Sequence, residues 1–240
     1  WTSKRGSVYE PWGTVESIGP PVDGLQYDGS PALSADGRSL YFSSNRGEGL
    51  GSQDLYVAKR DDKDSPWGSP VRLEVLNSTD TDWGPTISAD GLELLFTSRR
   101  AGDHNIYVSR RGTKDEPWGE PSSLGPPINV EGSDAAEPAL SDDGLTLFFC
   151  SYRPGGSGQI DLWASRRATR NSDWGPPVNL GPTVNSPGSE VGPCISADSS
   201  TLYFATQWLD EDSSLDIWMI SLAPVSGETY ADGELETSPR

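Results

Sequence analysis

The stretch PALSADGRSLYFSSNR at residues 31–46 returns three more times along the 240-residue chain. The later copies read PTISADGLELLFTSRR (85–100), PALSDDGLTLFFCSYR (138–153) and PCISADSSTLYFATQW (193–208). Their leading prolines are 54, 53 and 55 residues apart, a regularity typical of repeat proteins. A unit of this length that consists of short strands cannot bury its own apolar face. Neighbouring copies must therefore stack on one another.

Each copy starts as a hairpin of two strands. An Asp-Gly pair separates two apolar runs at 36–37, 90–91 and 143–144, and Asp-Gly favours tight hairpin turns because these need positive φ angles. The fourth copy has Asp198-Ser199 instead, which predicts a looser turn or a turn of another type. The second strands, such as SLYFSS, are apolar on both faces, so we expect them to be buried on both sides.

Two further strands complete each unit. The third strands are expected at 54–60, 105–111, 161–167 and 216–222, and the fourth strands follow Trp-Gly turns at 66–73, 117–124 and 173–180. Proline within the fourth strand marks it as the edge of the sheet. We expect the tryptophans of these turns to pack over neighbouring strands. Four-stranded antiparallel units repeated around an axis are the blades of a β-propeller. The alternative, a linear β-solenoid, normally uses shorter repeats.

The two ends of the chain bear on the number of blades. The last unit stops after its third strand, whereas PWGTVESI at 11–18 reads as a fourth strand without a preceding unit. Pairing the two would close a ring of four blades and protect an exposed edge. WTSKR at 1–5 resembles a third strand, so five blades with an incomplete fifth remain the alternative. We expect one propeller domain at 1–222 and an acidic tail at 223–240 outside its core.

Composition excludes some partners. The net charge of −18 opposes binding to nucleic acid and to anionic lipid surfaces. No run of 18 apolar residues occurs, so direct membrane insertion is not expected. The abundance of Trp, Gly, Pro, Asp and Ser suits a protein outside the cytoplasm. Cys150 and Cys194 lie in adjacent units, where a disulfide is conceivable, but two free thiols are the default expectation.

The repeat resembles a known family. Pro-x-(aliphatic)-Ser-x-Asp-Gly-x-x-(aliphatic)-x-Phe is similar to the TolB-like propeller repeat, a WD-like class, over about residues 11–222. Within that class, WGPPVNLGPTVNS at 174–186 resembles the blades of exported bacterial proteins. The resemblance implies a periplasmic or secreted propeller that acts as a binding or assembly module. It identifies no partner, because one fold serves many functions.

Candidate functional residues stand at the start of each innermost strand and the end of each second strand. The acidic positions are Asp28, Asp82 and Glu190, with Glu137 close to the corresponding place in the third unit, and the basic positions are Arg46, Arg100 and Arg153. Antiparallel pairing brings the two sets to one face of the ring. They form either ion pairs that join the blades or a site for a polar ligand or a cation, with calcium kept open. Trp83 and Trp208 break the repeat pattern on the same face. Sugar sites are often built from an indole beside carboxylates, but a tryptophan in this Trp-rich chain more often serves packing.

Catalytic signatures are sparse. His104 is the only histidine, which excludes a site of several histidine ligands, and no glycine-rich phosphate loop occurs. Glycoside hydrolysis is the one enzyme class left, because it needs only two carboxylates facing each other across a sugar. The sequence therefore predicts a non-enzymatic scaffold that binds a protein partner and requires no cofactor. The alternative is a carbohydrate-active propeller, either a glycan binder or a hydrolase. The hydrolase would use the carboxylates at the start of the innermost strands, which we call the axial carboxylates: Asp28, Asp82, Glu137 and Glu190.

Overall fold

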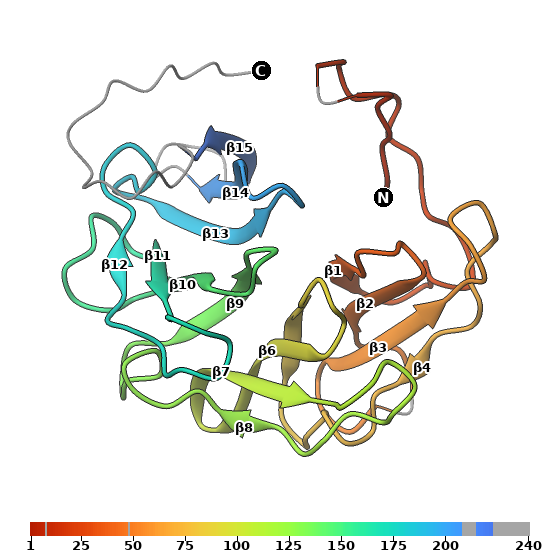
Figure 1. Ribbon diagram of the computed structural model, residues 1–240, viewed down its shortest axis with the longest axis horizontal. Coiled ribbons are helices and arrows are strands. Elements are labelled where there is room, and N and C mark those ends of the chain that lie inside the picture. Colours follow the sequence, from red (N-terminus) through yellow and green to blue (C-terminus); the bar gives the residue numbers. More distant parts are fainter. Residues whose placement is uncertain (8, 48, 208–214, 223–240) are drawn as a thin grey trace.

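The computed structural model describes residues 1–7, 9–47, 49–207 and 215–222. These residues form strands and no helix. The strands make four antiparallel sheets, three with four strands and one with three. The sheets follow one another around a common centre, as Figure 1 shows. This arrangement confirms the predicted all-β propeller with four blades.

The blades follow the order of the chain. The first consists of β1 (Asp28–Leu33), β2 (Ser39–Ser44), β3 (Asp54–Lys59) and β4 (Val71–Arg72), and the second of β5 (Asp82–Ile87), β6 (Glu93–Ala101), β7 (Asp103–Arg110) and β8 (Ser122–Ser123). The third consists of β9 (Ala135–Leu140), β10 (Thr146–Ser151), β11 (Asp161–Arg166) and β12 (Val178–Asn179), and the fourth of β13 (Ser189–Ile195), β14 (Thr201–Gln207) and β15 (Asp216–Ser221). The edge strands β4, β8 and β12 are shorter than expected. Each begins directly after a proline, which has no N–H for the ladder.

The hairpin turn is the same in all four blades. Gly37, Gly91 and Gly144 have φ angles of 70°, 73° and 73°. In the fourth blade Ser199 takes φ 57°. Its N–H donates to Ser196 O at 2.8 Å, as the N–H of Gly37 donates to Ser34 O at 2.7 Å. The expected change of turn type is therefore wrong, because the serine accepts the left-handed conformation that glycine takes elsewhere.

Neighbouring blades pack face to face through apolar side chains. Tyr41 of the first blade and Phe96 of the second belong to one buried cluster, and similar clusters join the second blade to the third and the third to the fourth. Leu55, Ile106 and Leu162 occupy equivalent positions in β3, β7 and β11, and each is 0% exposed. Full burial of such a side chain stabilises the fold by roughly 1.5–3 kcal/mol. The blades are thus held together mainly by contacts between sheets.

Repeated polar contacts fasten the outer part of each blade. An arginine lies over the tryptophan of each Trp-Gly turn, with 4.3 Å from Arg60 to Trp67, 4.2 Å from Arg111 to Trp118 and 4.4 Å from Arg167 to Trp174. Trp118 and Trp174 are 8% exposed, which confirms the expected packing role. Three buried asparagines, Asn77, Asn129 and Asn185, each bond both the N–H and the C=O of one third-strand residue. Each asparagine side chain thereby forms the hydrogen bonds with the third strand that one more backbone residue of the edge strand would form.

Residues 11–18 do not add a strand to the last blade. The sheet of β13, β14 and β15 has three strands among the described residues. Thr2 instead forms an antiparallel bridge with Glu16, and Gly13 N donates to Lys4 O at 2.9 Å. The expected closure of the ring by this strand is therefore not formed, because residues 1–5 take up the backbone groups that β15 would need.

Other sequence expectations concern the ends and the thiols. Both cysteines are free, with Cys150 buried and Cys194 exposed. No helix of the described residues is long and apolar enough to cross a membrane. The expected acidic tail at 223–240 lies outside the described residues.

Candidate functional site

Each innermost strand carries a β-bulge at its proline. The pairing of β1, β5, β9 and β13 with the second strands shifts register around Pro31, Pro85, Pro138 and Pro193. The residue before each proline takes a positive φ, which is 61° at both Gly84 and Gly192. Ser30 and Glu137 take φ 49° and 52° at the same place although they carry side chains. A residue with a Cβ that adopts the left-handed backbone conformation destabilises the fold by roughly 1–2 kcal/mol. Bulges often direct a side chain toward a functional site.

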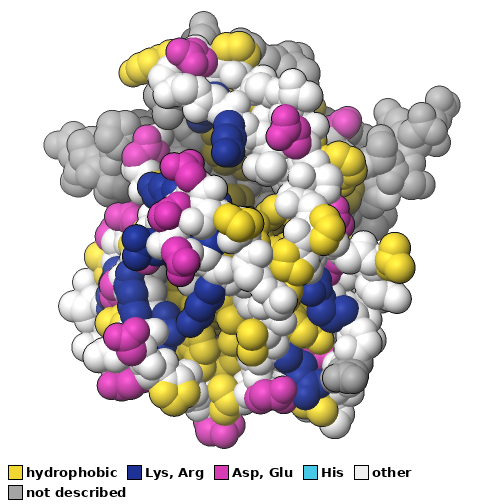
Figure 2. Space-filling model, turned by 90° about the vertical axis from the view of Figure 1, so that its right-hand side faces the viewer, with side chains coloured by type: hydrophobic (Ala, Val, Ile, Leu, Met, Phe, Trp, Pro, Cys, Tyr) yellow, Lys and Arg dark blue, Asp and Glu magenta, His cyan; other side chains and the backbone are white. Residues whose placement is uncertain are grey.

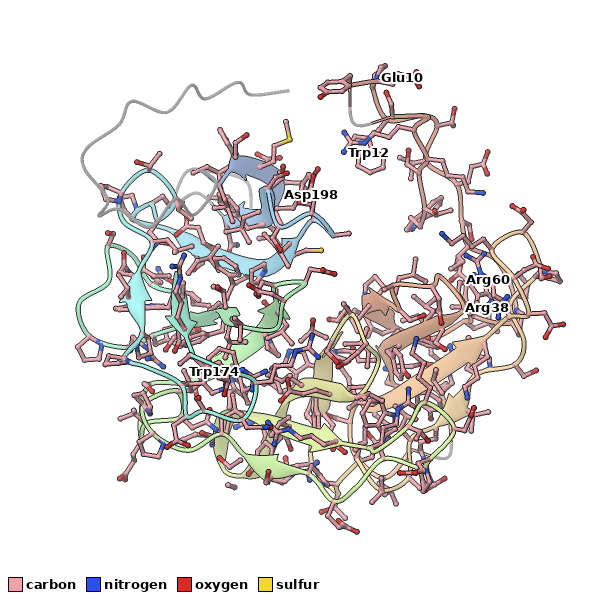
Figure 3. The ribbon with its side chains drawn as sticks, viewed as in Figure 1. Glu10, Trp12, Arg38, Arg60, Trp174 and Asp198 are labelled. Atoms are coloured by element: carbon pink, nitrogen blue, oxygen red, sulfur yellow. The ribbon has the colours of Figure 1, made fainter. Side chains whose placement is uncertain are left out.

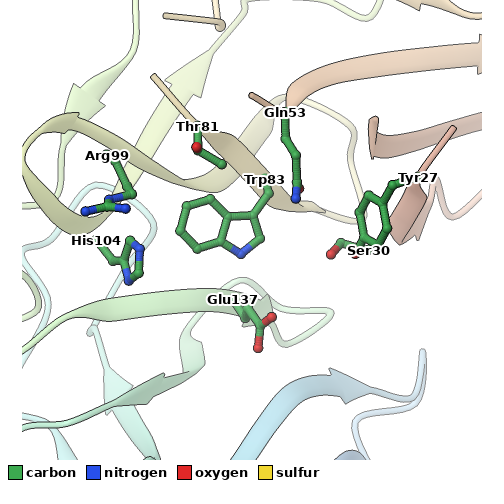
Figure 4. A pocket seen from close by; sticks show the side chains of 8 residues that line it. All are labelled: Tyr27, Ser30, Gln53, Thr81, Trp83, Arg99, His104 and Glu137. Atoms are coloured by element: carbon green, nitrogen blue, oxygen red, sulfur yellow. The ribbon is translucent and has the colours of Figure 1, made fainter. Parts of the chain in front are cut away.

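A cavity of about 270 Å³ opens beside these bulges, at the end of the ring where the innermost strands begin; we name this end the axial face. Its lining residues, shown in Figure 4, are Tyr27, Ser30, Gln53, Thr81, Trp83, Arg99, His104 and Glu137. They come from the first three blades. Pockets for whole small molecules usually measure about 300–1,000 Å³. This cavity therefore suits one side chain of a partner or one sugar ring.

Trp83 is the central aromatic residue of the cavity. Its indole meets the His104 ring edge to face, with 4.8 Å between the ring centroids and 83° between the planes. The backbone N–H of His104 donates to Asp134 Oδ1 at 2.9 Å, and His104 Nδ1 lies 3.5 Å from Asp134 Oδ2. The histidine is thereby fixed at two points. It in turn holds the half-buried indole at the cavity.

Glu137 is the only carboxylate among the lining residues of this cavity. Its Oε2 accepts a hydrogen bond from Gly192 N at 2.7 Å, and its own N–H donates to Thr97 Oγ1 at 2.8 Å. Cys150 Sγ lies 3.6 Å from the same Oε2. Burial first, and then the charge of Glu137, raise the pKa of Cys150 well above its usual value. Glu137 therefore touches the second and fourth blades as well as the cavity.

Two of the predicted carboxylates are bound by predicted arginines. Arg46 Nη2 lies 2.5 Å from Asp28 Oδ1, and Arg100 Nη2 lies 2.8 Å from Asp82 Oδ1. The side chains of Asp28 and Asp82 are 12% and 0% exposed. Burial acts to raise the pKa of Asp28, but hydrogen bonds from Arg46 and Ser44 outweigh it, so the net shift is downward. Both carboxylates thus lie inside ion pairs.

The third and fourth blades depart from this pairing. Arg153 has no acidic partner in an ion pair among the described residues; the position of its expected acid is Ala135. It donates instead to Ile128 O at 2.6 Å, and burial lowers its pKa to about 10. Glu190 is 0% exposed and accepts from Ser186 N at 3.0 Å and Ser186 Oγ at 2.6 Å. Burial raises the pKa of Glu190. Trp208 lies outside the described residues.

Of the predicted site residues, the structure thus brings Trp83 and Glu137 together at the cavity. The role of the whole predicted set in ligand binding stays a prediction. Sequence reasoning missed Tyr27, Gln53, Thr81, Arg99 and His104 as lining residues. One signal was present, because Tyr27 and Thr81 directly precede the acidic positions of their strands. The part of the chain that the structure describes contains no group of three or more His, Cys, Asp or Glu side chains suited to a metal ion.

The surface also carries many paired charges. In spite of the net charge of −18, Lys and Arg side chains lie among Asp and Glu side chains on the face that Figure 2 shows. Hydrophobic side chains gather between them on this face.

Comparisons with known proteins reveal the fold. No protein-family model matches the sequence, and neither does any curated protein. Among solved structures, TolB from Acinetobacter baumannii superposes with a TM-score of 0.53 at 16% identity over 80% of this chain. A putative TolB from Agrobacterium tumefaciens gives 0.52 at 18% identity over 82%. The chain spans only 41% and 59% of these two proteins.

Solved structures described as enzymes are similar to this chain to the same degree. A thermostable family-43 glycoside hydrolase has a TM-score of 0.57 at 13% identity, covering 92% of this chain and 97% of its own. An endo-arabinase from Bacteroides thetaiotaomicron has a TM-score of 0.55 at 20% identity, covering 85% and 78%. At such identities the likeness establishes the propeller fold and leaves the function open.

Proposed function

We propose that the protein is a non-enzymatic binding and assembly scaffold that receives a protein partner at its axial face. The observation that carries this proposal is the state of the axial carboxylates. Arg46 and Arg100 hold Asp28 and Asp82, and Glu190 is buried against Ser186. Paired or buried carboxylates are structural groups, because an unpaired buried charge is strongly destabilising.

The cavity supplies the binding surface in this proposal. Trp83 offers an aromatic face, and Gln53, Arg99 and Glu137 add polar groups of both hydrogen-bonding kinds around it. An aromatic anchor surrounded by polar groups is typical of the centre of a protein interface. The TolB likeness of the fold and of the repeat supports a location outside the cytoplasm, in the periplasm or secreted, as part of the same proposal.

A photo-crosslinking experiment tests this function. A benzophenone amino acid at position 27 at the cavity, and one at position 178 on the edge strand β12, would be compared in the natural host. We expect position 27 alone to capture one defined protein. Purified, this partner should bind the full chain, and Trp83→Ala should weaken binding at least 10-fold while the exposed control Val178→Ala leaves it unchanged. Equal capture at both positions, or binding that ignores Trp83, would refute the proposal.

A carbohydrate-binding function is the second candidate, and one observation favours it. The exposed part of Trp83 lies in the same small cavity as Glu137 and Gln53, a set that can stack on a sugar ring and bond its hydroxyls. Hydrolysis is less well supported, since the glycosidase mechanism requires two carboxylates and the cavity lining contains Glu137 alone.

A glycan array with and without calcium, followed by turnover assays on arabinan oligosaccharides, separates the candidates. Glycan binding that Trp83→Ala abolishes would replace the protein-binding proposal. Turnover that Glu137→Gln abolishes would establish an enzyme. A scaffold that binds a protein should show neither glycan binding nor turnover.

A further inference from the structure

Glu137 holds a carboxylate at the axial cavity in a backbone conformation that two of its three equivalents leave to glycine. Its φ is 52°, and the equivalents Gly84 and Gly192 have φ 61°. Two hydrogen bonds keep the glutamate in place, from its own N–H to Thr97 Oγ1 and from Gly192 N to its Oε2. Backbone strain that surrounding contacts maintain is common at ligand sites. A glutamate at this position therefore points to a role beyond packing.

This carboxylate has no cationic partner among the residues that the structure describes. Arginines pair with Asp28 and Asp82 on the same face, but none of the ion pairs includes Glu137. The contacts of its carboxylate with Gly192 and Cys150 both use Oε2, which leaves Oε1 without a hydrogen bond from a described residue. Partly buried carboxylates are normally paired. A cation that enters the cavity can complete this pair.

Two aromatic side chains share the cavity with Glu137. Figure 4 shows the Glu137 carboxylate below the indole of Trp83, with the Tyr27 ring on the same side of the indole. Tyr27 is 52% exposed and Trp83 is half-buried, so both rings keep free surface. Aromatic faces attract ammonium and guanidinium groups through the ring quadrupole. A carboxylate beside two such rings therefore suits a cation.

Trp83 also differs from the tryptophans of the outer turns. Arg60 lies 4.3 Å from the Trp67 ring and Arg167 lies 4.4 Å from the Trp174 ring, and Figure 3 shows Arg60 and Trp174 on opposite sides of the propeller. No arginine or lysine among the described residues lies over the Trp83 ring in this way. The aromatic surface of Trp83 is therefore left for a cation from outside the chain.

The charges around the cavity favour the same ligand. The net charge of −18 attracts cations to the protein and repels anions. Among the lining residues, Arg99 alone is a lysine or arginine, and Figure 4 shows it with His104 on the other side of the indole from Tyr27. Its Nε donates to Gly102 O at 3.4 Å. The part of the cavity between Tyr27, Trp83 and Glu137, which we name the Glu137 half, thus contains no cation of its own.

We propose that the Glu137 half of the cavity binds one basic side chain, lysine or arginine, of the protein partner. The cation pairs with Glu137, and its carbon chain lies against Trp83 and Tyr27. A cavity of about 270 Å³ accommodates one such side chain. This inference rests on the proposed function and adds the chemistry by which the axial face recognises its partner.

Capped tripeptides that differ only in the central residue are the probes, titrated into the full-length chain. The NMR signal of the Trp83 indole N–H, identified by its loss in Trp83→Phe, reports binding. We expect saturable shifts with millimolar Gly-Lys-Gly or Gly-Arg-Gly and none with Gly-Gln-Gly or Gly-Glu-Gly. Raising sodium chloride from about 50 to about 500 mM should weaken binding several-fold, because salt screens the pair. Comparison of the two basic peptides decides between ammonium and guanidinium.

Three variants separate the charge of Glu137 from its place in the fold. Glu137→Gln keeps an oxygen for Gly192 N–H, so it should retain the unfolding midpoint while it weakens binding of the basic tripeptides roughly 5-fold or more. Glu120→Gln, at an exposed glutamate outside the cavity lining, removes a carboxylate as well and is the matched control that should leave binding unchanged. Arg99→Met should strengthen binding, because it removes a cation that repels the ligand.

Two results would overturn the inference. One is the absence of binding of both basic tripeptides at millimolar concentration, and the other is binding that Glu137→Gln and Glu120→Gln change equally. Binding of Gly-Glu-Gly that Arg99→Met abolishes would replace the basic group by an acidic one.

Failure of this inference differs from failure of the proposed function. A partner captured at position 27 that binds Glu137→Gln as tightly as the natural chain would refute the basic side chain and leave the scaffold function intact. Tripeptide binding that depends on Glu137, with no protein captured at position 27, would refute the protein partner and leave a cation site.

Discussion

Arg167 of the third blade forms a buried ion pair with Glu93 of the second, with 2.6 Å between Nη2 and Oε2. The arginine side chain is 1% exposed and the glutamate side chain 8%. Only the second blade has an acid at this strand position, where the others have Ser39, Thr146 and Thr201. The contact thus joins two specific blades.

Removing one partner of this pair should be strongly destabilising. Arg167→Met leaves the Glu93 carboxylate buried with only Arg110, and we expect a loss of about 3–5 kcal/mol in the free energy of unfolding in urea. The control Arg110→Met removes a 53% exposed side chain from the same carboxylate and should cost less than about 1 kcal/mol. An equal loss of unfolding free energy in Arg167→Met and Arg110→Met would show that burial does not decide the strength of the ion pair.

The left-handed residues before the prolines predict opposite effects of two substitutions. Ser30→Gly relieves a φ of 49° and should stabilise the fold by about 1 kcal/mol. Gly192→Ala should cost about 1–2 kcal/mol, because its φ is 61° although an added Cβ meets nothing within 4 Å. Urea unfolding of both variants measures this. A neutral result for Gly192→Ala would mean that the bulge relaxes easily.

Truncating one of the buried asparagines to alanine should lower the free energy of unfolding substantially. In Asn129→Ala the N–H and C=O of Ile106 lose bonds of 2.9 and 2.8 Å. Ile106 O keeps its bond from Leu124 N at 3.0 Å. The Ile106 N–H alone is left unsatisfied, and one buried unsatisfied group should cost about 1–3 kcal/mol. Asn171→Ala, at an exposed residue, is the matched control and should change the free energy of unfolding little. A small effect of Asn129→Ala would indicate that water replaces the amide.

Asp198 predicts a dependence of stability on acid pH. Hydrogen bonds, first from Ser196 and then from Ser200, lower its pKa to about 2 from a usual value of 3.8. The folded state therefore holds the charged form more readily than the unfolded state does. The resulting stability is present above pH 3.8 and is lost as the pH falls toward 2. Unfolding measured from pH 5 to 2 should show a shallower decline for Asp198→Asn than for the natural chain.

The blade architecture was predictable because its contacts are local. The repeat period, the Asp-Gly turns and the prolines of the edge strands identified the strands to within a few residues. The pairing of Asp28 with Arg46 was also accessible, since antiparallel strands bring the start of one beside the end of the next. The unusual turn at Ser199 was mispredicted, because backbone hydrogen bonds of the hairpin override the residue preference.

The cavity was only partly predictable. Trp83 and Glu137 attracted notice because they break the repeat pattern. Gln53 and His104 gave no such signal, since they stand outside the repeated motif and join the cavity only when three blades are placed around the centre. Contacts between blades depend on how each sheet is twisted and bulged, and a one-dimensional period does not contain that information.

Alternation, turn chemistry and the period of 53 to 55 residues determined from sequence alone that this protein folds into blades and that each blade needs a neighbour. Only the tertiary structure decided that residues 11–18 pair with residues 1–5 and add no strand to the sheet of β15. Both pairings satisfy the same backbone hydrogen bonds. The choice between them depends on where the packing of the first and last blades holds the N-terminal segment in space.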